Sequence, residues 1–145
     1  MQLDKTTEGF IFSNDKSMLN VSYIHHYLST KSYWAKNIPI EIVRNSIDGS
    51  ICFGIYTRGN QIGFARLITD NATFAYLADV FIDENYRGHG LSKELMTLIM
   101  KHIHSKNIRR VMLATKDAHG LYEQFGFEAI PDPQKIMGIK FFEEY

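Results

Sequence analysis

The chain has 145 residues, of which 45% are hydrophobic and 22% charged, and this is the size and composition of one folded domain, not of a disordered segment. Its 16 Lys and Arg residues balance 16 Asp and Glu residues, so a partner held by bulk electrostatics, such as non-specific nucleic acid or an anionic membrane surface, is not expected. The single cysteine excludes an internal disulfide, and the lack of a leader-like start or a long apolar run predicts a cytoplasmic protein that does not enter a membrane.

The N-terminal third predicts one strand followed by two helices. Residues 9–14 alternate between apolar and polar side chains, which predicts a short strand. From residue 16 to about 27, apolar residues recur at helical spacing, with Asn14 or Asp15 as the N-cap. A second, short helix over about 39–47 begins at a proline, a residue that suits the first turn of a helix.

The middle of the chain is rich in strand-forming residues. The runs 51–57 and 61–69 flank Arg58-Gly59-Asn60, which predicts a hairpin. The third run, 73–83, is apolar almost throughout, and this is typical of a strand buried on both faces in the interior of a sheet.

The C-terminal half alternates between strands and helices. A stripe of leucine and isoleucine predicts an amphipathic helix over about 89–105. A strand at 110–115, a helix at about 118–125 and, beyond two prolines, a last strand at 135–142 complete the order. We therefore predict one α/β or α+β domain over residues 1–145, built on a mixed sheet.

The loop between the third run and the long helix indicates a ligand. Gly88 and Gly90 permit positive φ, and successive backbone N–H groups beside a helix start can converge on a phosphate. A turn that merely requires glycine is the alternative at this point. The loop is not a Walker A motif, which needs Gly-Lys followed by Ser or Thr, nor a dinucleotide fingerprint, whose third glycine would fall at Lys93.

Two motifs resemble those of the GNAT superfamily of N-acyltransferases. Arg87-Gly88-His89-Gly90-Leu91-Ser92 resembles the family's acyl-CoA pyrophosphate loop, Gln/Arg-x-x-Gly-x-Gly/Ala, with Ser92 at the last small position. Thirty residues downstream, Leu121-Tyr122-Glu123-Gln124-Phe125-Gly126-Phe127 resembles its Leu-Tyr-x-x-x-Gly-Phe signature. The resemblance covers about residues 50–142 and implies a mixed, mostly antiparallel central sheet flanked by helices.

The resemblance implies acetyl-CoA as the co-substrate. Main-chain groups around Val80, Phe81 and Ile82 would pair with the pantetheine arm, in a V-shaped gap between the third run and the strand at 110–115. Backbone N–H groups from the loop would hold the pyrophosphate: Arg87, Gly88, His89, Gly90, Leu91 and Ser92. We expect no metal, because the histidine pairs 25/26 and 102/104 diverge on a helix.

Two residues are candidates for catalysis. Tyr122 matches the family tyrosine that donates a proton to the departing thiolate, and its alternative role is core packing. Asp79 is the only acid inside the third run, which ends at Asp83, so it is a candidate general base with a raised pKa. It could equally be a structural acid at a bulge, and in many relatives water chains remove the amine proton.

The acceptor would be recognised by the N-terminal part of the chain. Tyr33 and Trp34 would wall its pocket, and Arg66 could pair with an acceptor carboxylate, with core packing and a surface charge as the alternatives. The leading hypothesis is an N-acetyltransferase that acts on a primary amine of a small molecule or peptide. The alternative is a non-catalytic acyl-CoA-binding module that regulates a partner, and a homodimer is open in either case.

Overall fold

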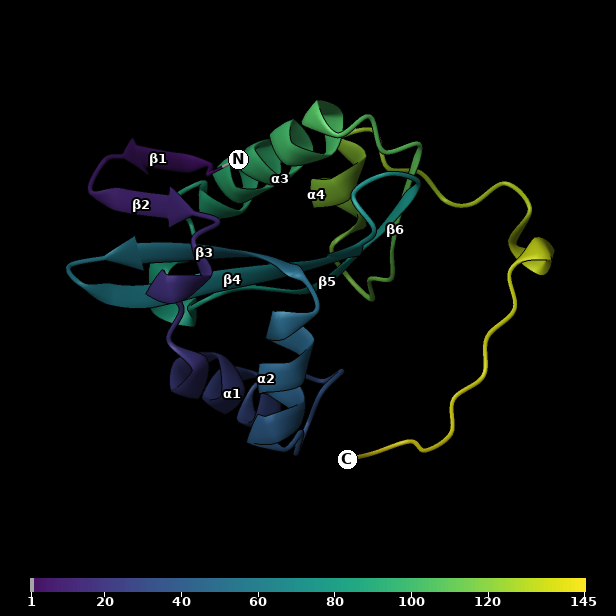
Figure 1. The fold of residues 1–145 in the computed structure, drawn as a ribbon, viewed down its shortest axis with the longest axis horizontal. Coiled ribbons are helices and arrows are strands. Elements are labelled where there is room, and N and C mark those ends of the chain that lie inside the picture. Colours follow the sequence, from purple (N-terminus) through teal and green to yellow (C-terminus); the bar gives the residue numbers. More distant parts are fainter. Residues whose placement is uncertain (1) are drawn as a thin grey trace.

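One six-stranded sheet organises the computed structural model, which describes residues 2–145 (Figure 1). The strands follow one another across the sheet in chain order, and all neighbours are antiparallel except the last pair, which is parallel. They are β1 (Asp4–Thr7), β2 (Phe10–Ser13), β3 (Ile51–Thr57), β4 (Asn60–Thr69), β5 (Phe74–Ile82) and β6 (Arg110–Leu113). This is the mixed, mostly antiparallel sheet that the sequence predicts.

Helices cover both faces of the sheet. Helices α1 (Val21–Thr30) and α2 (Ile40–Asp48) lie on one face, and α3 (Leu91–Ser105) and α4 (His119–Glu123) lie on the other (Figure 1). Because successive side chains of a strand point to opposite faces, each face has its own apolar core. Phe53 packs with the core under α3, whereas its neighbour Cys52 packs with the core under α1 and α2.

The first predicted helix divides into two parts. A short 3₁₀ turn, η1 (Lys16–Met18), follows Asp15, whose side chain accepts a hydrogen bond from the Ser17 backbone N–H at 2.9 Å. Helix α1 begins only after Asn20, whose side chain accepts a bond from Tyr23 N at 3.0 Å. Asp15, one of the two predicted N-caps, therefore caps the 3₁₀ turn. Helix α1 has its own N-cap, Asn20, which was not predicted.

The other helices and the strands from β2 to β6 match their predicted ranges to within two residues. Strand β1 was not predicted. It joins β2 through a two-residue turn at Glu8 and Gly9, both with positive φ (50° and 82°), as a tight hairpin requires.

The strand predicted over 135–142 is wrong. A short 3₁₀ turn, η3 (Pro133–Lys135), ends at its first residue, and the chain then loops out from the body and turns back so that its C-terminal end lies near α2 (Figure 1). No strand follows β6 within the described residues. Strand-like alternation fixes which side chains share a face, but a strand must also pair with a neighbouring edge, and this segment pairs with none among the described residues.

No helix within residues 2–145 is both long and apolar enough to cross a bilayer. The cytoplasmic location stays a prediction.

Gly54 on β3 offers a test of the packing. A Cβ at this position would lie 2.2 Å from the Tyr56 hydroxyl oxygen and 2.6 Å from the ring carbon that carries it. We therefore expect Gly54→Ala to lower the free energy of unfolding by about 1–3 kcal/mol, measured by urea denaturation. Gly120→Ala is the control, because a Cβ there meets no atom within 4 Å. Equal stability of the two variants would contradict the packing described.

Candidate functional site

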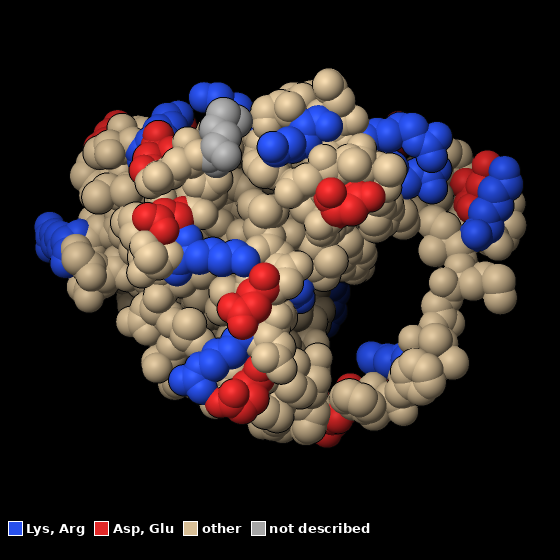
Figure 2. Space-filling model, in the orientation of Figure 1, with Lys and Arg blue, Asp and Glu red and all other residues tan. Residues whose placement is uncertain are grey.

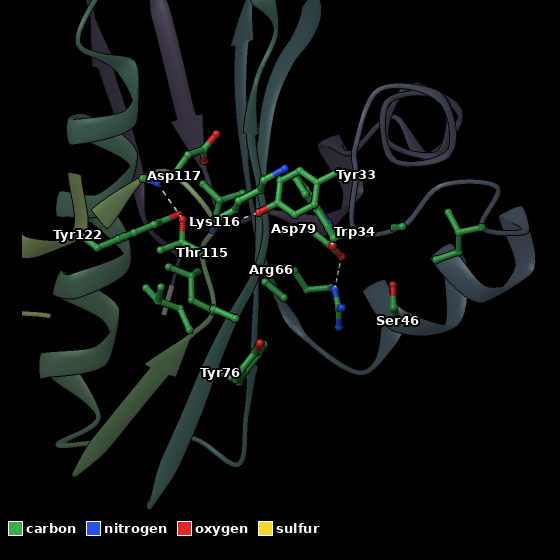
Figure 3. Close-up of a pocket in the computed structure, with 18 of the residues that line it drawn as sticks. Tyr33, Trp34, Ser46, Arg66, Tyr76, Asp79, Thr115, Lys116, Asp117 and Tyr122 are labelled. Atoms are coloured by element: carbon green, nitrogen blue, oxygen red, sulfur yellow. Dashed lines mark hydrogen bonds and ion pairs between the residues drawn. The ribbon is translucent and has the colours of Figure 1, made fainter. Parts of the chain in front are cut away.

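A cleft opens where β5 and β6 separate. Their pairing ends at Leu77 and Leu113, although β5 continues to Ile82. Beyond that point a cavity of about 670 Å³ lies between residues 78–80 and residues 113–118 (Figure 3). A volume of this size is typical of a small-molecule site. The cleft lies between β5 and β6, where the resemblance implies a V-shaped gap.

A β-bulge shapes the cleft wall. Phe64 pairs with Phe81 and Arg66 pairs with Ala78, so two residues of β5, Asp79 and Val80, oppose one residue of β4. Asp79 has a φ of 53°, a left-handed conformation that aspartate tolerates better than most residues. Bulges bend a strand and re-aim its side chains, and here the bulge lies at the point where β5 leaves β6.

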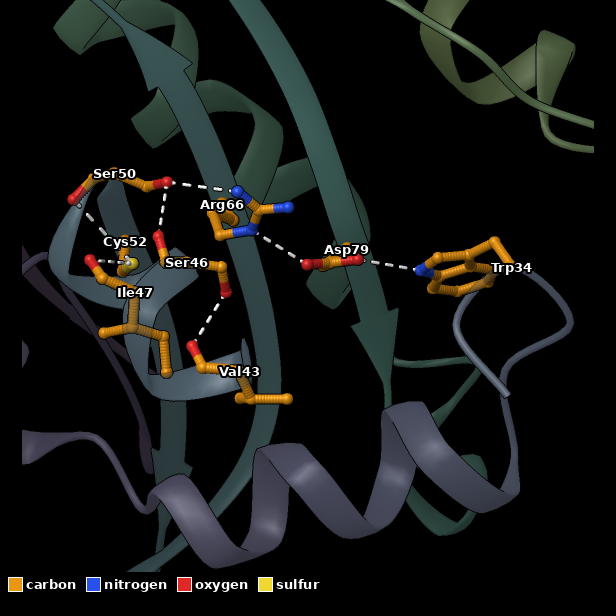
Figure 4. Close-up of polar contacts among 8 residues, drawn as sticks. All are labelled: Trp34, Val43, Ser46, Ile47, Ser50, Cys52, Arg66 and Asp79. Carbon is orange, nitrogen blue, oxygen red and sulfur yellow. Dashed lines mark hydrogen bonds and ion pairs between the residues drawn. The ribbon is translucent and has the colours of Figure 1, made fainter. Parts of the chain in front are cut away.

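Both oxygens of the Asp79 carboxylate accept hydrogen bonds from neighbouring side chains. One oxygen accepts a hydrogen bond from Arg66 Nε at 2.8 Å, and the other accepts one from Trp34 Nε1 at 2.8 Å (Figure 4). Arg66 also donates from Nη1 to the Ser50 hydroxyl at 3.2 Å. The side chains of Arg66 and Asp79 are only 16% and 10% exposed, so this is a largely buried ion pair. Asp79 thus lies at a bulge with side-chain partners on both oxygens, and Arg66 is directed at Asp79; the catalytic role of Asp79 stays a prediction.

Two aromatic residues form a bridge over the cleft. The rings of Tyr33 and Trp34 meet edge to face with centroids 5.0 Å apart, and both remain exposed (Figure 3). The Tyr33 hydroxyl accepts a hydrogen bond from the Lys116 backbone N–H at 3.3 Å, and the Lys116 ammonium lies 5.4 Å from the Tyr33 ring centroid. These contacts join the segment before α2 to the segment after β6. The predicted pair therefore lies at the cleft, where exposed aromatic side chains can contact a ligand.

Three further residues line this cleft and were not singled out from the sequence. They are Ser46, Tyr76 and Lys116 (Figure 3). Tyr76 lies in an apolar strand run, where a tyrosine is expected in the core, and Ser46 has no motif around it. Only their position in the fold brings them to the cavity.

Tyr122 lies in α4 and lines the same cleft (Figure 3). Its helix follows a turn in which the Thr115 hydroxyl accepts a hydrogen bond from Ala118 N at 3.0 Å. Burial raises the pKa of Tyr122, with smaller contributions from Tyr33 and Asp117. The phenol therefore keeps its proton at neutral pH and can act as a hydrogen-bond donor.

The glycine loop presents a row of backbone donors. Gly88 and Gly90 have φ of 86° and 73°, and α3 starts directly after Gly90. Within the described part of the chain, no backbone N–H from residues 87–93 donates to a protein acceptor. A Cβ at either glycine would meet no atom within 4 Å, and a cavity of about 220 Å³ lies against the loop. Unpaired donors beside a helix start favour an anion.

The charged side chains of this loop do not dominate it. The Arg87 guanidinium turns inward and donates to the Ile82 carbonyl at 3.4 Å and the Tyr27 hydroxyl at 3.2 Å. The His89 ring packs beside Phe10, with centroids 6.0 Å apart. Basic and acidic residues also alternate over the visible face of the molecule (Figure 2). The loop can therefore attract an anion mainly through its backbone.

Comparison with known proteins gives consistent matches. The sequence profile of the Acetyltransferase (GNAT) family matches residues 18–127. A crystal structure of a GNAT-family protein from Xanthomonas campestris pv. campestris is 44% identical, with a TM-score of 0.89 over 95% of this chain and 96% of that one. An uncharacterized ycf52-like N-acetyltransferase of Prochlorococcus marinus is 30% identical over 128 residues, which are 84% of this chain and 69% of the relative.

A GNAT family acetyltransferase from Elizabethkingia anophelis, solved with acetyl-CoA bound, has a TM-score of 0.63 at 13% identity, over 84% of this chain and 78% of that one. This likeness concerns the fold.

The ion pair in the cleft wall gives a testable consequence. Asp79→Asn keeps the tolerance for left-handed φ but leaves the Arg66 cation without a counter-charge, so we expect a loss of about 3 kcal/mol in unfolding free energy. Adding Arg66→Met should recover part of this loss, because the uncompensated charge is removed. The control is Glu41→Gln in the exposed pair with Arg44, where we expect less than about 0.5 kcal/mol. Strictly additive effects of the Asp79 and Arg66 variants would contradict the coupling.

Proposed function

The chain belongs to the acetyltransferase (GNAT) family, and from this premise we propose that it transfers the acetyl group of acetyl-CoA to a primary amine of a small molecule or peptide. Acetyl-CoA-dependent N-acetyl transfer is the general reaction of this family. One observation carries the proposal for this chain: a row of unpaired backbone donors at residues 87–93 follows β5, the strand that forms one wall of the cleft lined by Tyr122.

The cofactor would lie along the free edge of β5. On its other edge this strand pairs with β4, where Phe81 and Ile82 oppose Phe64 and Gly63. Beyond Leu77 its outer edge has no partner on β6, so main-chain groups of Val80, Phe81 and Ile82 can pair with the pantetheine amides as an added strand would. The thioester then points into the cleft.

The pyrophosphate would sit on the loop at the end of β5. The N–H groups of Arg87, Gly88, His89, Gly90, Leu91 and Ser92 would donate to its oxygens, and the positive end of the α3 dipole adds a favourable field. The chain carries no net charge, so these directed donors supply the attraction that bulk charge does not.

The chemistry would be a direct transfer. The amine nitrogen attacks the thioester carbonyl carbon, the new C–N bond forms, and the C–S bond breaks. Tyr122 donates its proton to the departing thiolate sulfur, and the buried phenol carries that proton at neutral pH. The amine releases its proton to water in the cleft, so the reaction needs no carboxylate base.

Asp79 would then position the cleft wall. Because both of its oxygens accept hydrogen bonds, it holds the Trp34 indole and the Arg66 guanidinium in place, and the Arg66 cation compensates its charge. The acceptor would pack between Tyr33, Trp34 and Tyr76, which line the cleft opposite Tyr122. This arrangement favours an acceptor with an apolar or aromatic body next to its amine.

Binding of acetyl-CoA tests the loop assignment. In Gly90→Val the side chain enters the open space above the loop and blocks approach to the backbone donors, so we expect the Kd for acetyl-CoA to rise at least about tenfold in calorimetry. The matched control is Gly59→Val, which has a similar φ of 77° and equally open surroundings but lies in the β3–β4 turn. Equal affinities of the two variants would contradict the assignment.

Turnover tests the role of Tyr122. We expect Tyr122→Phe to lower kcat by about a hundredfold or more while the Kd for acetyl-CoA stays within about twofold, since the proton is needed only as the thiolate leaves. Free-thiol release from acetyl-CoA over a panel of amines and peptides measures this effect. Unchanged turnover would exclude the acid role, and binding without turnover on any amine would favour the non-catalytic acyl-CoA-binding module.

A further inference from the structure

Tyr122 lies in a helix that is too short to hold its own direction. Helix α4 has five residues, His119–Glu123, and its N-cap residue, Ala118, makes no side-chain cap hydrogen bond. Two backbone bonds to the Ala118 carbonyl form its first turn, from Leu121 N at 3.1 Å and from Tyr122 N at 3.4 Å. A helix of this length is not stable on its own in water. The direction of the Tyr122 phenol therefore depends on what holds Ala118 in place.

Two side-chain hydroxyls hold the turn that leads from β6 into α4. Residues 115–117 make no backbone–backbone hydrogen bond with any described residue. Instead, Ala118 N donates to the Thr115 hydroxyl at 3.0 Å. Lys116 N donates to the Tyr33 hydroxyl at 3.3 Å (Figure 3). The first bond is local, whereas the second comes from the segment between α1 and α2, 83 positions away in the chain. The turn is therefore tied to a distant part of the fold through the Tyr33 hydroxyl.

The Tyr33 ring is itself fixed by its neighbours. Tyr33 is 59% exposed, so its hydroxyl can hold the turn only if other contacts restrict the ring. The ring meets Trp34 edge to face with centroids 5.0 Å apart, and the Trp34 indole donates to Asp79 at 2.8 Å. The Lys116 ammonium lies 5.4 Å from the centroid of the Tyr33 ring. A chain of contacts thus runs from the bulge in β5 through two rings to the turn before α4.

We propose that Tyr33 is a positioning residue: its hydroxyl, with that of Thr115, fixes the turn at residues 115–118 and so directs the Tyr122 phenol into the cleft. This role rests on the proposed function, in which Tyr122 is the proton donor. The two parts of Tyr33 then have separate tasks, because the ring packs against the acceptor while the hydroxyl holds the turn. A displacement of about 1 Å in a catalytic group can cost about a hundredfold in rate, so a hydrogen bond outside the reaction affects turnover.

The kinetics of Tyr33→Phe separate a positioning role from a contact with the acceptor. The variant keeps the ring and loses only the hydroxyl, so we expect kcat to fall at least about fivefold while the acceptor KM and the Kd for acetyl-CoA stay within about twofold. The matched control is Tyr56→Phe, which removes a buried hydroxyl that lies outside the cleft and has no hydrogen-bond partner among the described residues. Its kcat should stay within about twofold of the wild-type value. Unchanged kcat in Tyr33→Phe, or a higher acceptor KM at constant kcat, would overturn the proposal.

Further variants identify the element through which Tyr33 acts. Thr115→Val removes the second hydroxyl that holds the turn and should lower kcat in the same way, and Thr115→Ser should largely keep the wild-type kcat because it still supplies an acceptor for Ala118 N. In a Tyr122→Phe background there is no proton donor to direct, so adding Tyr33→Phe should change kcat by less than about twofold. An equal loss in both backgrounds would overturn the proposal.

Hydrogen exchange tests the positioning without any turnover. We expect Tyr33→Phe to raise the amide exchange rates of Leu121 and Tyr122 at least about threefold, because the turn that anchors their acceptor is loosened, and Tyr56→Phe to leave these rates unchanged. Faster exchange at Lys116 alone would overturn the proposal, since the hydroxyl would then hold the turn without holding α4. If the exchange rates respond but the wild-type chain acetylates no amine, the proposed chemistry fails and the positioning of Tyr122 stands.

Discussion

The bulge at Asp79 is the constraint on which the cleft depends. An extra residue in β5 bends the strand just beyond Leu77, where its pairing with β6 has ended, and the two parallel strands then diverge instead of continuing as a ladder. A left-handed φ at a non-glycine residue costs free energy, so the bulge needs support from its surroundings. The two hydrogen bonds that Asp79 accepts, from Arg66 and Trp34, supply this support and also fix two residues of the cleft wall.

The free strand edge and the glycine loop form one continuous set of donors and acceptors. Once β6 has diverged, the outer backbone groups of β5 lack a partner on that strand, and only four residues, 83–86, separate the end of β5 from the first unpaired N–H group of the loop. Backbone groups that water alone satisfies are suited to an extended ligand with amides at one end and phosphates at the other. Such a site needs no excess of basic side chains, which accords with a chain whose charges balance.

Features set by local rules could be predicted from the sequence. The strands β3 to β5 and helix α3 follow from periodicity, and the glycine loop follows from the φ that only glycine adopts freely. The contacts of Asp79 could not be predicted, because its partners lie 13 and 45 positions away in the chain and meet it only through the bulge. Strand β1 was missed because its residues, Asp4–Thr7, are polar, although the Glu8-Gly9 pair was a usable turn signal.

The error at residues 135–142 has a different origin. Periodicity predicts that a segment can form a strand, but it does not say to which edge that strand belongs. The outer edge of β6 is unpaired among the described residues, so an edge for such a strand exists, but the segment does not lie along it. Leu113, Thr115 and Tyr122 line both the cleft and a second cavity of about 340 Å³, so the wall that carries Tyr122 borders two cavities and is held by the packing of β6 and α4.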